Sequence, residues 1–538
     1  MPGKTLIAVP LVEASPPLAE QAASALRAGA QVIELRVDRI GDLGAVEQFL
    51  RRERRLPVIA TVRAASEGGS WTGPENDRLA FLARLARRRP DYLDVEYATW
   101  VSAPPELRTA AAELRGTGGR LILSHHDTVG ARADFASLHA RIAAAGADVV
   151  KIVFTAGDAT DGLRLLTGLA QVGAQRPTIA LAMGSPGLAT RVLAGRFAAH
   201  LTFAALSPDA GSAPGQPSLA ELRVLYRWDE SGPETAVYGV VGWPVGHSLG
   251  PQVHNAALRA TGQDAVYVPL PVRPDEAGFE NFMQVLADHP ELGVAGLSIT
   301  LPHKEHALRW LERAGMPVTD VARRCRAVNT LTRTAAGRWA GDNTDVDGIV
   351  AALAGVSALA GSGLGGRRVA VLGAGGAARA AVVALQERGC DVTVYNRTAE
   401  RAARLAHELR CAFGPWPARG GGWDARGPAA LGQSAPAAVG AEIARADILI
   451  NCTSVGLWPA ENDAPVPDDL LRPGAIVFDT VYNPPETRLL RAARARGCTV
   501  IPGAAMFIGQ AAAQIERWHG VPAPRPIMEA ALAAALSH

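Results

Sequence analysis

The sequence predicts an α/β protein in which a (β/α)8 barrel is followed by a second α/β region with a Rossmann-type sheet. The first observation is an eight-fold alternation of short apolar runs and helix-like segments over residues 1–228. The second is the glycine-rich stretch GAGGAAR at 373–379, which stands between a strand candidate and a helical segment. The third is the length of 538 residues, which is enough for two to four domains.

Eight strands are expected in the first part, and each is a short apolar run followed by a helix-like segment. They are Leu6–Val9, Val32–Val37, Val58–Val62, Tyr92–Val95, Leu121–Ser124, Val149–Val153, Thr178–Ala182 and Leu201–Ala205. Intervening stretches such as Leu18–Ala28 and Arg78–Arg88 carry apolar residues at helical spacing. Eight such units in this length give a barrel near the lower end of the usual size range.

Polar residues occur in pairs, two positions apart, at the carboxyl ends of four of these strands. The pairs are Glu34 with Arg36, Thr61 with Arg63, Asp94 with Glu96, and Ser124 with His126. Residues two apart lie on one face of a strand, and the carboxyl ends of barrel strands surround the active site. We therefore expect a charged, inward-facing pocket, with His125 directed the other way into a packing or supporting position.

Lysine is rare in this chain, because only Lys4, Lys151 and Lys304 of its 54 basic residues are lysine. Arginine stays protonated at any working pH, whereas a desolvated lysine can act as a nucleophile or a proton donor. Lys151 falls in the sixth expected strand, and Lys304 falls in the second half of the chain. These two lysines therefore predict two active sites.

Several segments of the first part occur in the order found in one enzyme family. They are ELRVD (34–38), TVRAASEGG (61–69), SHHD (124–127), Lys151 and SAPGQ (212–216). Over residues 4–228 the chain resembles type I 3-dehydroquinate dehydratase, with Thr190 where that family more often has serine. The resemblance implies a Schiff base on Lys151, with His126 as general acid/base and Glu67 as its orienting partner. It also implies residues that hold the hydroxyls and the carboxylate of the substrate, namely Glu34, Arg36, Arg63, Arg191, Ser212 and Gln216.

The chemistry of such a dehydration needs these residue types. A proton next to a ketone is hard to remove, and an iminium formed with a lysine accepts the electrons that are left behind. A histidine with a pKa of about 7 can take this proton and return one to the leaving hydroxide. Arginine side chains suit a substrate carboxylate, which they bind through paired hydrogen bonds.

The segment YRWDESGPET at 226–235 interrupts the apolar rhythm and predicts a short linker, after which a strand is expected at Ala236–Val241. The expected domains are the barrel at 1–228, the linker at 229–235, a substrate-binding domain at 236–345 completed by helices at about 503–538, and a dinucleotide-binding domain at 346–502. A stretch rich in glycine, alanine and proline, Phe413–Gly440, is expected to be a long surface loop.

A strand expected at Arg368–Leu372 leads into GAGGAAR, where glycines let the backbone approach a pyrophosphate at a helix amino terminus. The next strand, Asp391–Tyr395, ends in NRTAER (396–401), where a site selective for NAD usually has an acidic residue. Positive charge at this point favours the 2′-phosphate of NADP. The cofactor contacts are expected from Gly373, Ala374, Gly375, Gly376, Ala377, Asn396, Arg397, Thr398 and Arg401.

Further motifs precede this turn, namely GHSLGP (246–251), TLPHKE (300–305), AVNT (327–330) and GDNTD (341–345). Their Lys304, Asn329 and Asp345 supply an ammonium, an amide and a carboxylate, which suit a polyol substrate. Together with NCTSVG (451–456), DTVYNPPET (479–487) and Gln510, these motifs resemble shikimate dehydrogenase over residues 236–538. The resemblance implies catalysis by Lys304 and Asp345. It implies substrate contacts from Ser248, Thr300, Asn329 and Gln510, with Tyr482 beside the cleft.

Two positions depart from this second family, because Gly250 stands where the family has serine and Ala505 stands where glycine is common. A missing hydroxyl at Gly250 removes one hydrogen bond and is expected to open space beside the substrate ring. The identity of the polyol is therefore left open. A quinate dehydrogenase, or a relaxed quinate/shikimate dehydrogenase, is the alternative for the second half.

Together the two resemblances imply consecutive reactions, the dehydration of 3-dehydroquinate to 3-dehydroshikimate and the NADPH-dependent reduction of that product to shikimate. In another class of function, one half would only sense pathway metabolites and would not need the proton chemistry of Lys151, His126, Lys304 and Asp345. The expected ligands are these small molecules and NADP. No metal ion is expected, because the sequence has no clear cluster of metal-binding residues.

The composition of the chain argues against several other classes of protein function. A net charge of +2, without basic segments interleaved with aromatics, argues against nucleic-acid binding, and the arginines at 51–55 are expected to form a solvated helix end. Five cysteines without a CxxC spacing predict free thiols. No run is long enough to span a membrane and no leader pattern is present, so a cytoplasmic protein without a membrane partner is expected, with a homodimer as one option.

Overall fold

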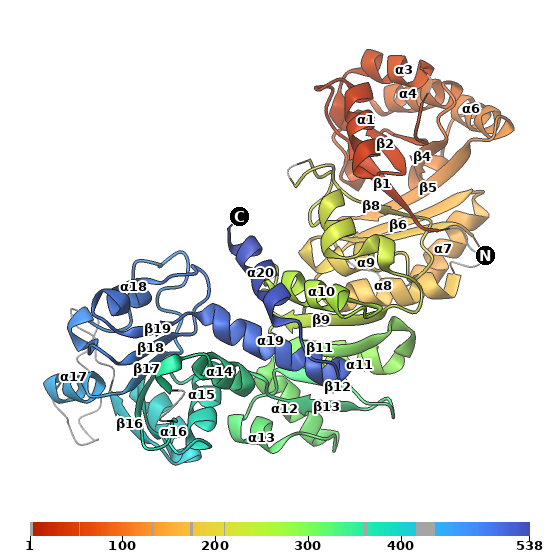
Figure 1. Cartoon of the computed structure of the whole chain (residues 1–538). Coiled ribbons are helices and arrows are strands. Elements are labelled where there is room, and N and C mark those ends of the chain that lie inside the picture. Colours follow the sequence, from red (N-terminus) through yellow and green to blue (C-terminus); the bar gives the residue numbers. More distant parts are fainter. Residues whose placement is uncertain are drawn as a thin grey trace. The chain divides into compact units, whose positions relative to one another are not determined.

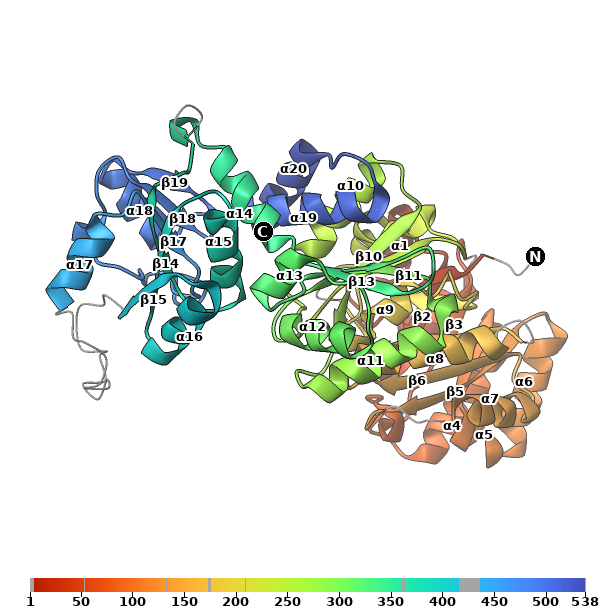
Figure 2. The same cartoon turned by 90° about the horizontal axis from the view of Figure 1, so that it is seen from below.

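The computed structural model describes residues 4–52, 54–130, 134–172, 176–208, 210–359, 363–415 and 436–537. The chain divides into two compact units (Figures 1 and 2). The first consists of Met1–Pro251 and Asp264–Val294, and the second of Gln252–Gln263 and Ala295–His538. Over the ranges that are described, no helix combines the length and the apolar character needed to cross a membrane.

The first unit contains the predicted barrel, whose strands run from red to yellow in Figure 1. Its eight strands follow the order β7-β6-β5-β4-β3-β2-β1-β8 with parallel pairing, so the ring is nearly closed. The strands are β1 (Leu6–Leu11), β2 (Val32–Arg36), β3 (Val58–Thr61), β4 (Tyr92–Glu96), β5 (Arg120–Asp127), β6 (Val149–Thr155), β7 (Thr178–Met183) and β8 (Leu201–Phe203). All eight predicted strands are confirmed.

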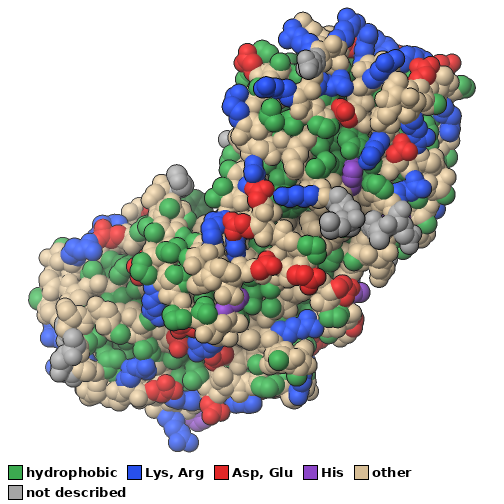
Figure 3. Space-filling model, turned by 45° about the vertical axis from the view of Figure 1, so that its right-hand side comes forward, with side chains coloured by type: hydrophobic (Ala, Val, Ile, Leu, Met, Phe, Trp, Pro, Cys, Tyr) green, Lys and Arg blue, Asp and Glu red, His purple; other side chains and the backbone are tan. Residues whose placement is uncertain are grey.

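Helices surround the strands of the barrel. They are α1 (Leu18–Ala28), α3 (Leu43–Arg51), α4 (Glu75–Arg87), α6 (Pro105–Gly116), α7 (Phe135–Ala144), α8 (Ala159–Val172) and α9 (Leu188–Val192). The Asp42 side chain accepts the Ala45 N–H at the start of α3, and Gly29 ends α1 with a φ of 96°. Arg51 ends α3 and pairs with Glu47, as expected of a solvated helix end. Basic and acidic side chains are mixed across the face drawn in Figure 3.

Side chains inside the barrel form layers that follow the two-residue period of the strands. One residue from each strand contributes to an apolar cluster, namely Ala8, Val32, Ile59, Tyr92, Ile122, Val149, Ile179 and Leu201. Two residues further along, five of the strands carry buried polar side chains instead, namely Glu34, Thr61, Asp94, Ser124 and Lys151. The apolar layer therefore closes the floor beneath a polar layer, which contains the first residue of each predicted inward-facing pair.

Buried side chains hold the segment that follows the barrel. Tyr226 and Trp228 are buried, and the Arg227 guanidinium donates to the Ala265 carbonyl (2.8 Å) and pairs with Glu230 (2.8 Å). Strands β9 (Ala236–Gly242) and β10 (Ala265–Pro271) then pair in parallel, and α11 (Glu276–Asp288) packs against α8. The strand predicted after the junction is confirmed as β9.

The second unit contains a small α/β region that carries one of the predicted sites. Strands β11 (Val294–Ile299), β12 (Thr330–Arg333) and β13 (Trp339–Asp342) are antiparallel neighbours. The same region contains helices α12 (Lys304–Arg313), α13 (Asp320–Cys325) and α14 (Asp345–Ala354). Of the C-terminal helices α19 (Gly503–His519) and α20 (Arg525–Leu536), the first packs along α14.

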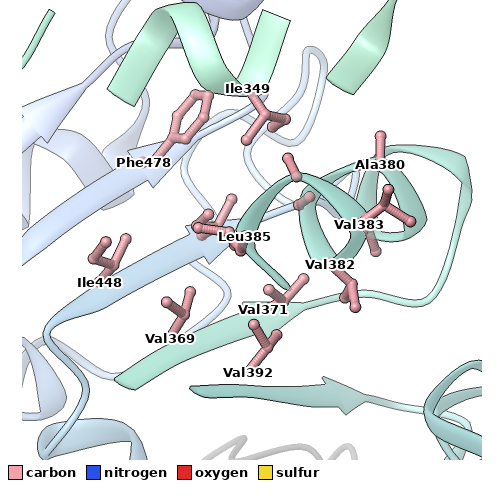
Figure 4. Packing of buried hydrophobic residues seen from close by; sticks show 14 of the residues in the cluster. Ile349, Val369, Val371, Ala380, Val382, Val383, Leu385, Val392, Ile448 and Phe478 are labelled. Atoms are coloured by element: carbon pink, nitrogen blue, oxygen red, sulfur yellow. The ribbon is translucent and has the colours of Figure 1, made fainter. Parts of the chain in front are cut away.

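A parallel six-stranded sheet completes the second unit, in the order β16-β15-β14-β17-β18-β19. Its strands are β14 (Arg368–Leu372), β15 (Asp391–Asn396), β16 (Ala412–Pro415), β17 (Ile448–Asn451), β18 (Ile476–Asp479) and β19 (Thr499–Ile501), with helices α15 (Gly376–Gln386), α16 (Ala399–Leu409), α17 (Pro436–Ala444) and α18 (Arg488–Ala495). The reversal of order at β14 is that of a Rossmann fold, as predicted. Figure 4 shows its core, where Val371, Val392 and Ile448 of the sheet pack with Leu385 of α15.

The prediction of a long surface loop at Phe413–Gly440 is wrong at both ends. Strand β16 pairs with β15 up to Pro415, and α17 already begins at Pro436. Pairing at a sheet edge overrides the local composition, which is rich in glycine and proline. Residues 416–435 of this stretch lie outside the described residues.

Candidate active sites

The barrel pocket is lined by residues that the sequence singles out, together with apolar side chains. The lining includes Glu34, Arg36, Arg63, Glu67, His126, Lys151, Arg191 and Ser212, with Val153, Leu181, Met183 and Phe203. Lys151 projects from β6 and is 4% exposed. Its Nζ lies 2.8 Å from Asp94, 3.5 Å from Glu34 and 4.9 Å from the centre of the Phe203 ring. Two carboxylates therefore hold the lysine amine in the pocket.

Asp94 links this lysine to the rest of the pocket. Its carboxylate contacts Lys151 and Arg63, each at 2.8 Å, and accepts a hydrogen bond from the Ser124 hydroxyl at 2.6 Å. Burial raises the pKa of Asp94, but Arg63 and Lys151 lower it by more, so its pKa lies well below the ordinary value. The charged Asp94 carboxylate holds Lys151 in place. The position of Asp94 in a predicted inward-facing pair did not by itself reveal this role.

His126 and Glu67 form a hydrogen-bonded pair in the same pocket. The His126 Nδ1 lies 3.1 Å from a Glu67 carboxylate oxygen, which also accepts the His126 backbone N–H at 2.9 Å. Burial, together with Arg63 and Lys151, lowers the pKa of His126 well below its ordinary value, and burial raises the pKa of Glu67 to about 7. The imidazole is therefore kept neutral and can accept a proton.

Arg191 has the properties of a carboxylate-binding residue. Its side chain is buried, and among the described residues no acidic group pairs with it and its Nε has no hydrogen-bond partner. Burial lowers the pKa of this guanidinium to about 10. A buried charge without a partner is costly, and a substrate carboxylate would supply the missing partner.

Ser212 lines the pocket, and Gln216 supports the Ser212 loop. The backbone N–H and the hydroxyl of Ser212 donate to the Gln216 side-chain oxygen at 2.9 and 3.2 Å. The two neighbouring histidines of β5 separate as predicted. His126 faces the pocket, and His125 lines a different small cavity with Phe135 and Leu138.

The second predicted site centres on Lys304, the first residue of α12. Its ammonium forms an ion pair with Asp345, the first residue of α14, and Asn329 donates to the other Asp345 oxygen at 2.9 Å. The Thr344 N–H donates to the Asn329 side-chain oxygen at 2.7 Å, which fixes the orientation of the amide. Two helix starts therefore bring together the three residues that the motifs predict.

Tyr482 and Gln510 are placed by the packing of α19. Tyr482 stacks on Phe507 of this helix with ring centres 4.8 Å apart, and Gln510 follows about one turn later. A Cβ at Gly348 of α14 would lie 2.7 Å from the Met506 carbonyl oxygen and 3.2 Å from the Gln510 Cβ, so glycine permits the close approach of the two helices. Because Asp345 begins α14, this contact brings Gln510 to the part of α14 that carries the Lys304–Asp345 ion pair.

The other two substrate residues expected for this site occupy different places. Thr300 lies in the turn between β11 and α12, whereas Ser248 belongs to the first unit, just before α10 (Gly250–Ala260). The Ser248 hydroxyl accepts the Gly250 N–H at 3.2 Å. Ser248 is thus fixed at the start of a helix, which gives its hydroxyl one orientation.

The surroundings of Gly250 pack closely, while the expectation that it opens space beside the substrate ring stays a prediction. A Cβ at this position would lie 3.2 Å from the Ser248 Oγ, 3.2 Å from the Tyr267 Cε1 and 3.3 Å from the Tyr267 hydroxyl oxygen. The Tyr267 side chain is buried and would make a tight contact with a Cβ at residue 250. A side chain at residue 250 would therefore require Ser248 or Tyr267 to shift by a few tenths of an ångström.

The turn between β14 and α15 fits a dinucleotide. Gly373 has a φ of 109°, and a Cβ there would lie 2.9 Å from the Cys452 carbonyl oxygen, so this position needs glycine. A Cβ at Gly375 would meet nothing within 4 Å, and no side chain caps the start of α15. Open space in front of uncapped helix N–H groups is what a pyrophosphate requires. A Cβ at Gly376 would lie 3.8 Å from the Lys304 Cδ, so the turn adjoins this lysine.

Arg397 and Arg401 fit the 2′-phosphate of NADP. Both are exposed where β15 leads into α16, and over the described ranges neither makes an ion pair with an acidic side chain. The Asn396 side chain donates to the Thr398 carbonyl at 2.9 Å and shapes the turn between them. Two uncompensated cations therefore stand where an NAD site would have an acid.

Some residues that hold the second site carry only a weak sequence signal. Gln514 is 1% exposed; its side-chain oxygen accepts the Ser298 hydroxyl (2.8 Å), and its amide donates to the Thr330 hydroxyl (3.0 Å). Thr330 in turn donates to Asn329 at 2.7 Å. The four-residue spacing from Gln510, which puts both glutamines on one helix face, is the signal that could have found it.

Family profiles match successive parts of the chain. Residues 7–233 match type I 3-dehydroquinase, and residues 240–331 match the shikimate dehydrogenase substrate binding domain. Residues 357–413 match shikimate/quinate 5-dehydrogenase, and residues 503–533 match the shikimate 5′-dehydrogenase C-terminal domain. The matches follow the order of the elements that carry the two sites.

Curated relatives match either most of the chain or its second half. The chloroplastic bifunctional 3-dehydroquinate dehydratase/shikimate dehydrogenase of Arabidopsis thaliana is 35% identical over 516 residues, which cover 93% of this chain and 79% of the relative. The shikimate dehydrogenases (NADP(+)) of Moorella thermoacetica and Halorubrum lacusprofundi are 39% and 42% identical over 56% of this chain, and the matches cover 94% and 99% of those proteins. The chain therefore belongs to the family of bifunctional 3-dehydroquinate dehydratase/shikimate dehydrogenases.

Proposed function

We propose that the chain catalyses two consecutive reactions in two separate sites. The barrel dehydrates 3-dehydroquinate to 3-dehydroshikimate through Lys151, and the second site reduces this product to shikimate with NADPH through Lys304. The observation that carries the proposal is that two of the three lysines each pair with a carboxylate inside a site of matching polar groups. The purified full chain should dehydrate 3-dehydroquinate without added cofactor and oxidise shikimate with NADP. A folded chain that does neither would contradict the proposal.

In the first site, the Lys151 amine attacks the substrate ketone, and loss of water gives an iminium that accepts electrons from the neighbouring C–H bond. Neutral His126 takes that proton on the ring nitrogen opposite Glu67 and later gives it to the leaving hydroxyl, which departs as water. Hydrolysis of the iminium then releases the product and restores the amine. Arg191 holds the substrate carboxylate, and the remaining substrate contacts come from Glu34, Arg36, Arg63, Ser212 and Gln216.

In the second site, NADPH supplies a hydride to the ketone carbon when it is bound. The Lys304 ammonium donates a hydrogen bond to the ketone oxygen and gives it a proton as negative charge develops there. Asp345 and Asn329 hold Lys304 in place. The remaining substrate contacts come from Ser248, Thr300, Tyr482 and Gln510. The cofactor contacts come from Gly373, Ala374, Gly375, Gly376, Ala377, Asn396, Arg397, Thr398 and Arg401.

The two activities correspond to the expected domains, which we propose as a dehydratase barrel at 1–228, a linker at 229–235, a substrate domain at 236–345 with about 503–538, and a cofactor domain at 346–502. The nearly closed barrel and the strand order of the second sheet support this division. The unpaired state of all five cysteines supports a reducing compartment such as the cytoplasm. A homodimer is the assembly to test, by sedimentation.

Arg397→Ala is expected to raise the KM for NADP by roughly 10- to 100-fold, because a charge-assisted contact to the 2′-phosphate is lost. The KM for NAD should change little, since NAD lacks this phosphate. Steady-state shikimate oxidation with each cofactor measures the effect. Arg445→Ala, at another exposed arginine of the second unit, is the matched control. Equal losses with both cofactors would remove Arg397 from this role.

Quinate is expected to be a poorer substrate than shikimate, by about tenfold or more in kcat/KM, because Ser248 and Tyr267 pack closely beside Gly250 and limit the room for an added tertiary hydroxyl. Steady-state oxidation of both polyols, with NADP and with NAD, measures this ratio. The curated relatives over this region are named as shikimate dehydrogenases. A chain that oxidises quinate as well as shikimate, or better, would establish the alternative quinate or relaxed dehydrogenase.

A further inference from the structure

Arg78 is a fully buried arginine that does not line the dehydratase pocket. It lies on α4 with 0% exposure, and all five of its N–H groups have acceptors. One terminal nitrogen donates to the Val62 carbonyl (2.7 Å) and to Glu96 (2.8 Å), and the other donates to Glu75 (2.6 Å) and the Thr99 hydroxyl (3.0 Å). Its Nε also donates to Glu75, at 2.8 Å. A fully satisfied guanidinium in this position has one fixed geometry.

Glu96 connects Arg78 to the pocket. It is 2% exposed, and one carboxylate oxygen accepts from Arg78 at 2.8 Å. The other oxygen accepts from Arg63 at 3.1 Å and from the Ala64 backbone N–H at 2.9 Å. Glu96 therefore holds both the Arg63 side chain and the first residue of the segment that leads to Glu67.

The contacts continue as a line of alternating charges into the pocket. Arg63 contacts Asp94 at 2.8 Å, and Asp94 contacts Lys151 at 2.8 Å. The line therefore runs Arg78, Glu96, Arg63, Asp94, Lys151, and no side chain in it is more than 6% exposed. Beyond the line, Arg78 also pairs with Glu75 and Lys151 with Glu34. In a buried line of this kind each ion depends on its neighbours, because an unpaired buried charge is strongly destabilising.

We propose that Arg78 is a positioning residue for the dehydratase site. Its guanidinium holds the Glu96 carboxylate, and Glu96 in turn holds Arg63 and the segment that leads to Glu67 in place for the substrate. This inference rests on the proposed function of the barrel pocket, in which Arg63 contacts the substrate. Arg78 also neutralises part of the negative charge of Glu96. Without it, the full negative charge of Glu96 would act on Arg63 and on the pocket.

The electrostatic consequence has a definite sign. The charged groups that face Glu67 and His126 are Arg36, Arg63, Asp94, Glu96 and Lys151. Removing the Arg78 cation makes the potential at this pair more negative, which raises the pKa of an acid or a base. Because His126 must be neutral to accept a proton, the acid limb of the dehydratase pH profile should move to higher pH, by about half a pH unit.

Arg78→Met in the full chain tests the inference. We expect the dehydratase KM to rise roughly 10- to 100-fold, since Arg63 is displaced, together with the shift of the acid limb. The dehydrogenase activity of the same chain should not change, and it serves as an internal measure of folded protein. The double variant Arg78→Met/Glu96→Gln should reverse the shift of the acid limb, because it removes the uncompensated charge. A folded Arg78→Met chain with unchanged KM and pH profile would overturn the proposal.

If Arg78→Met does not fold, Arg78→Lys decides the question. Lysine keeps the charge but cannot donate the five hydrogen bonds of the Arg78 guanidinium. A raised dehydratase KM with normal dehydrogenase activity would therefore support the positioning role. An unchanged KM in this variant would overturn it. Trapping of a Lys151 adduct in the wild-type chain is a separate test of the proposed function. Its failure would count against the Schiff base and not against Arg78 alone.

Discussion

Lys151→Arg should lower the turnover of 3-dehydroquinate by on the order of 10³-fold or more, because the substitution removes the nucleophile on which the iminium forms. The ion pair with Asp94 can persist, since arginine keeps the positive charge. Loss of activity would therefore report on covalent chemistry and not on electrostatics. The measurement is steady-state dehydration, with shikimate oxidation by the same sample as the control for folding.

Borohydride reduction in the presence of 3-dehydroshikimate gives the covalent evidence for this prediction. The wild-type chain should gain the mass of the reduced ligand on the peptide that contains Lys151, and Lys151→Arg should gain none. Lys4 is the matched internal control, because it is exposed and lies outside the barrel pocket. Mass on another residue, or substantial turnover by Lys151→Arg, would show that the iminium assignment is wrong.

Lys304→Met should lower shikimate oxidation by roughly 10²- to 10⁴-fold, because it removes the proton donor that stabilises the developing alkoxide. The loss should appear mainly in kcat, since the residues of the cofactor turn are unchanged. Dehydration of 3-dehydroquinate should stay at the wild-type level, because Lys151 and its partners lie in the other unit. The two activities measured on one sample provide the comparison.

Asp345→Asn is the companion variant for Lys304. It keeps the shape of the side chain and removes the charge that pairs with Lys304. A smaller loss than for Lys304→Met is expected, because the proton donor remains but is held less firmly. If Lys304→Met retained near-normal kcat while Asp345→Asn abolished activity, the roles of acid and orienting partner would have to be exchanged.

Much of the barrel site could be predicted because the period of a strand is simple. Residues two apart share a face, so the pairs Glu34 with Arg36 and Ser124 with His126 identified inward positions without any tertiary information. The same alternation separated His125 from His126, and the two indeed line different cavities. The glycine-rich turn could be predicted because its conformation restricts the residue type, as the φ of 109° at Gly373 shows.

Features set by packing between distant segments could not be predicted in this way. Tyr267 packs closely against Gly250 from β10, and nothing near residue 250 in the sequence indicates this. Arg78 reads as an ordinary charged residue of an amphipathic helix, yet it is fully buried against Glu96. Strand β16 forms because β15 offers an edge for pairing, which local composition does not reveal.

Conversion of 3-dehydroquinate and NADPH to shikimate by mixed variants tests most directly whether one chain carries two independent active sites. Lys151→Arg alone and Lys304→Met alone should each fail to oxidise NADPH when 3-dehydroquinate is the only substrate. An equimolar mixture of the two variants should oxidise NADPH and form shikimate, because each chain supplies the site that the other lacks. No shikimate from the mixture, with both variants folded and each retaining its other activity, would contradict the account.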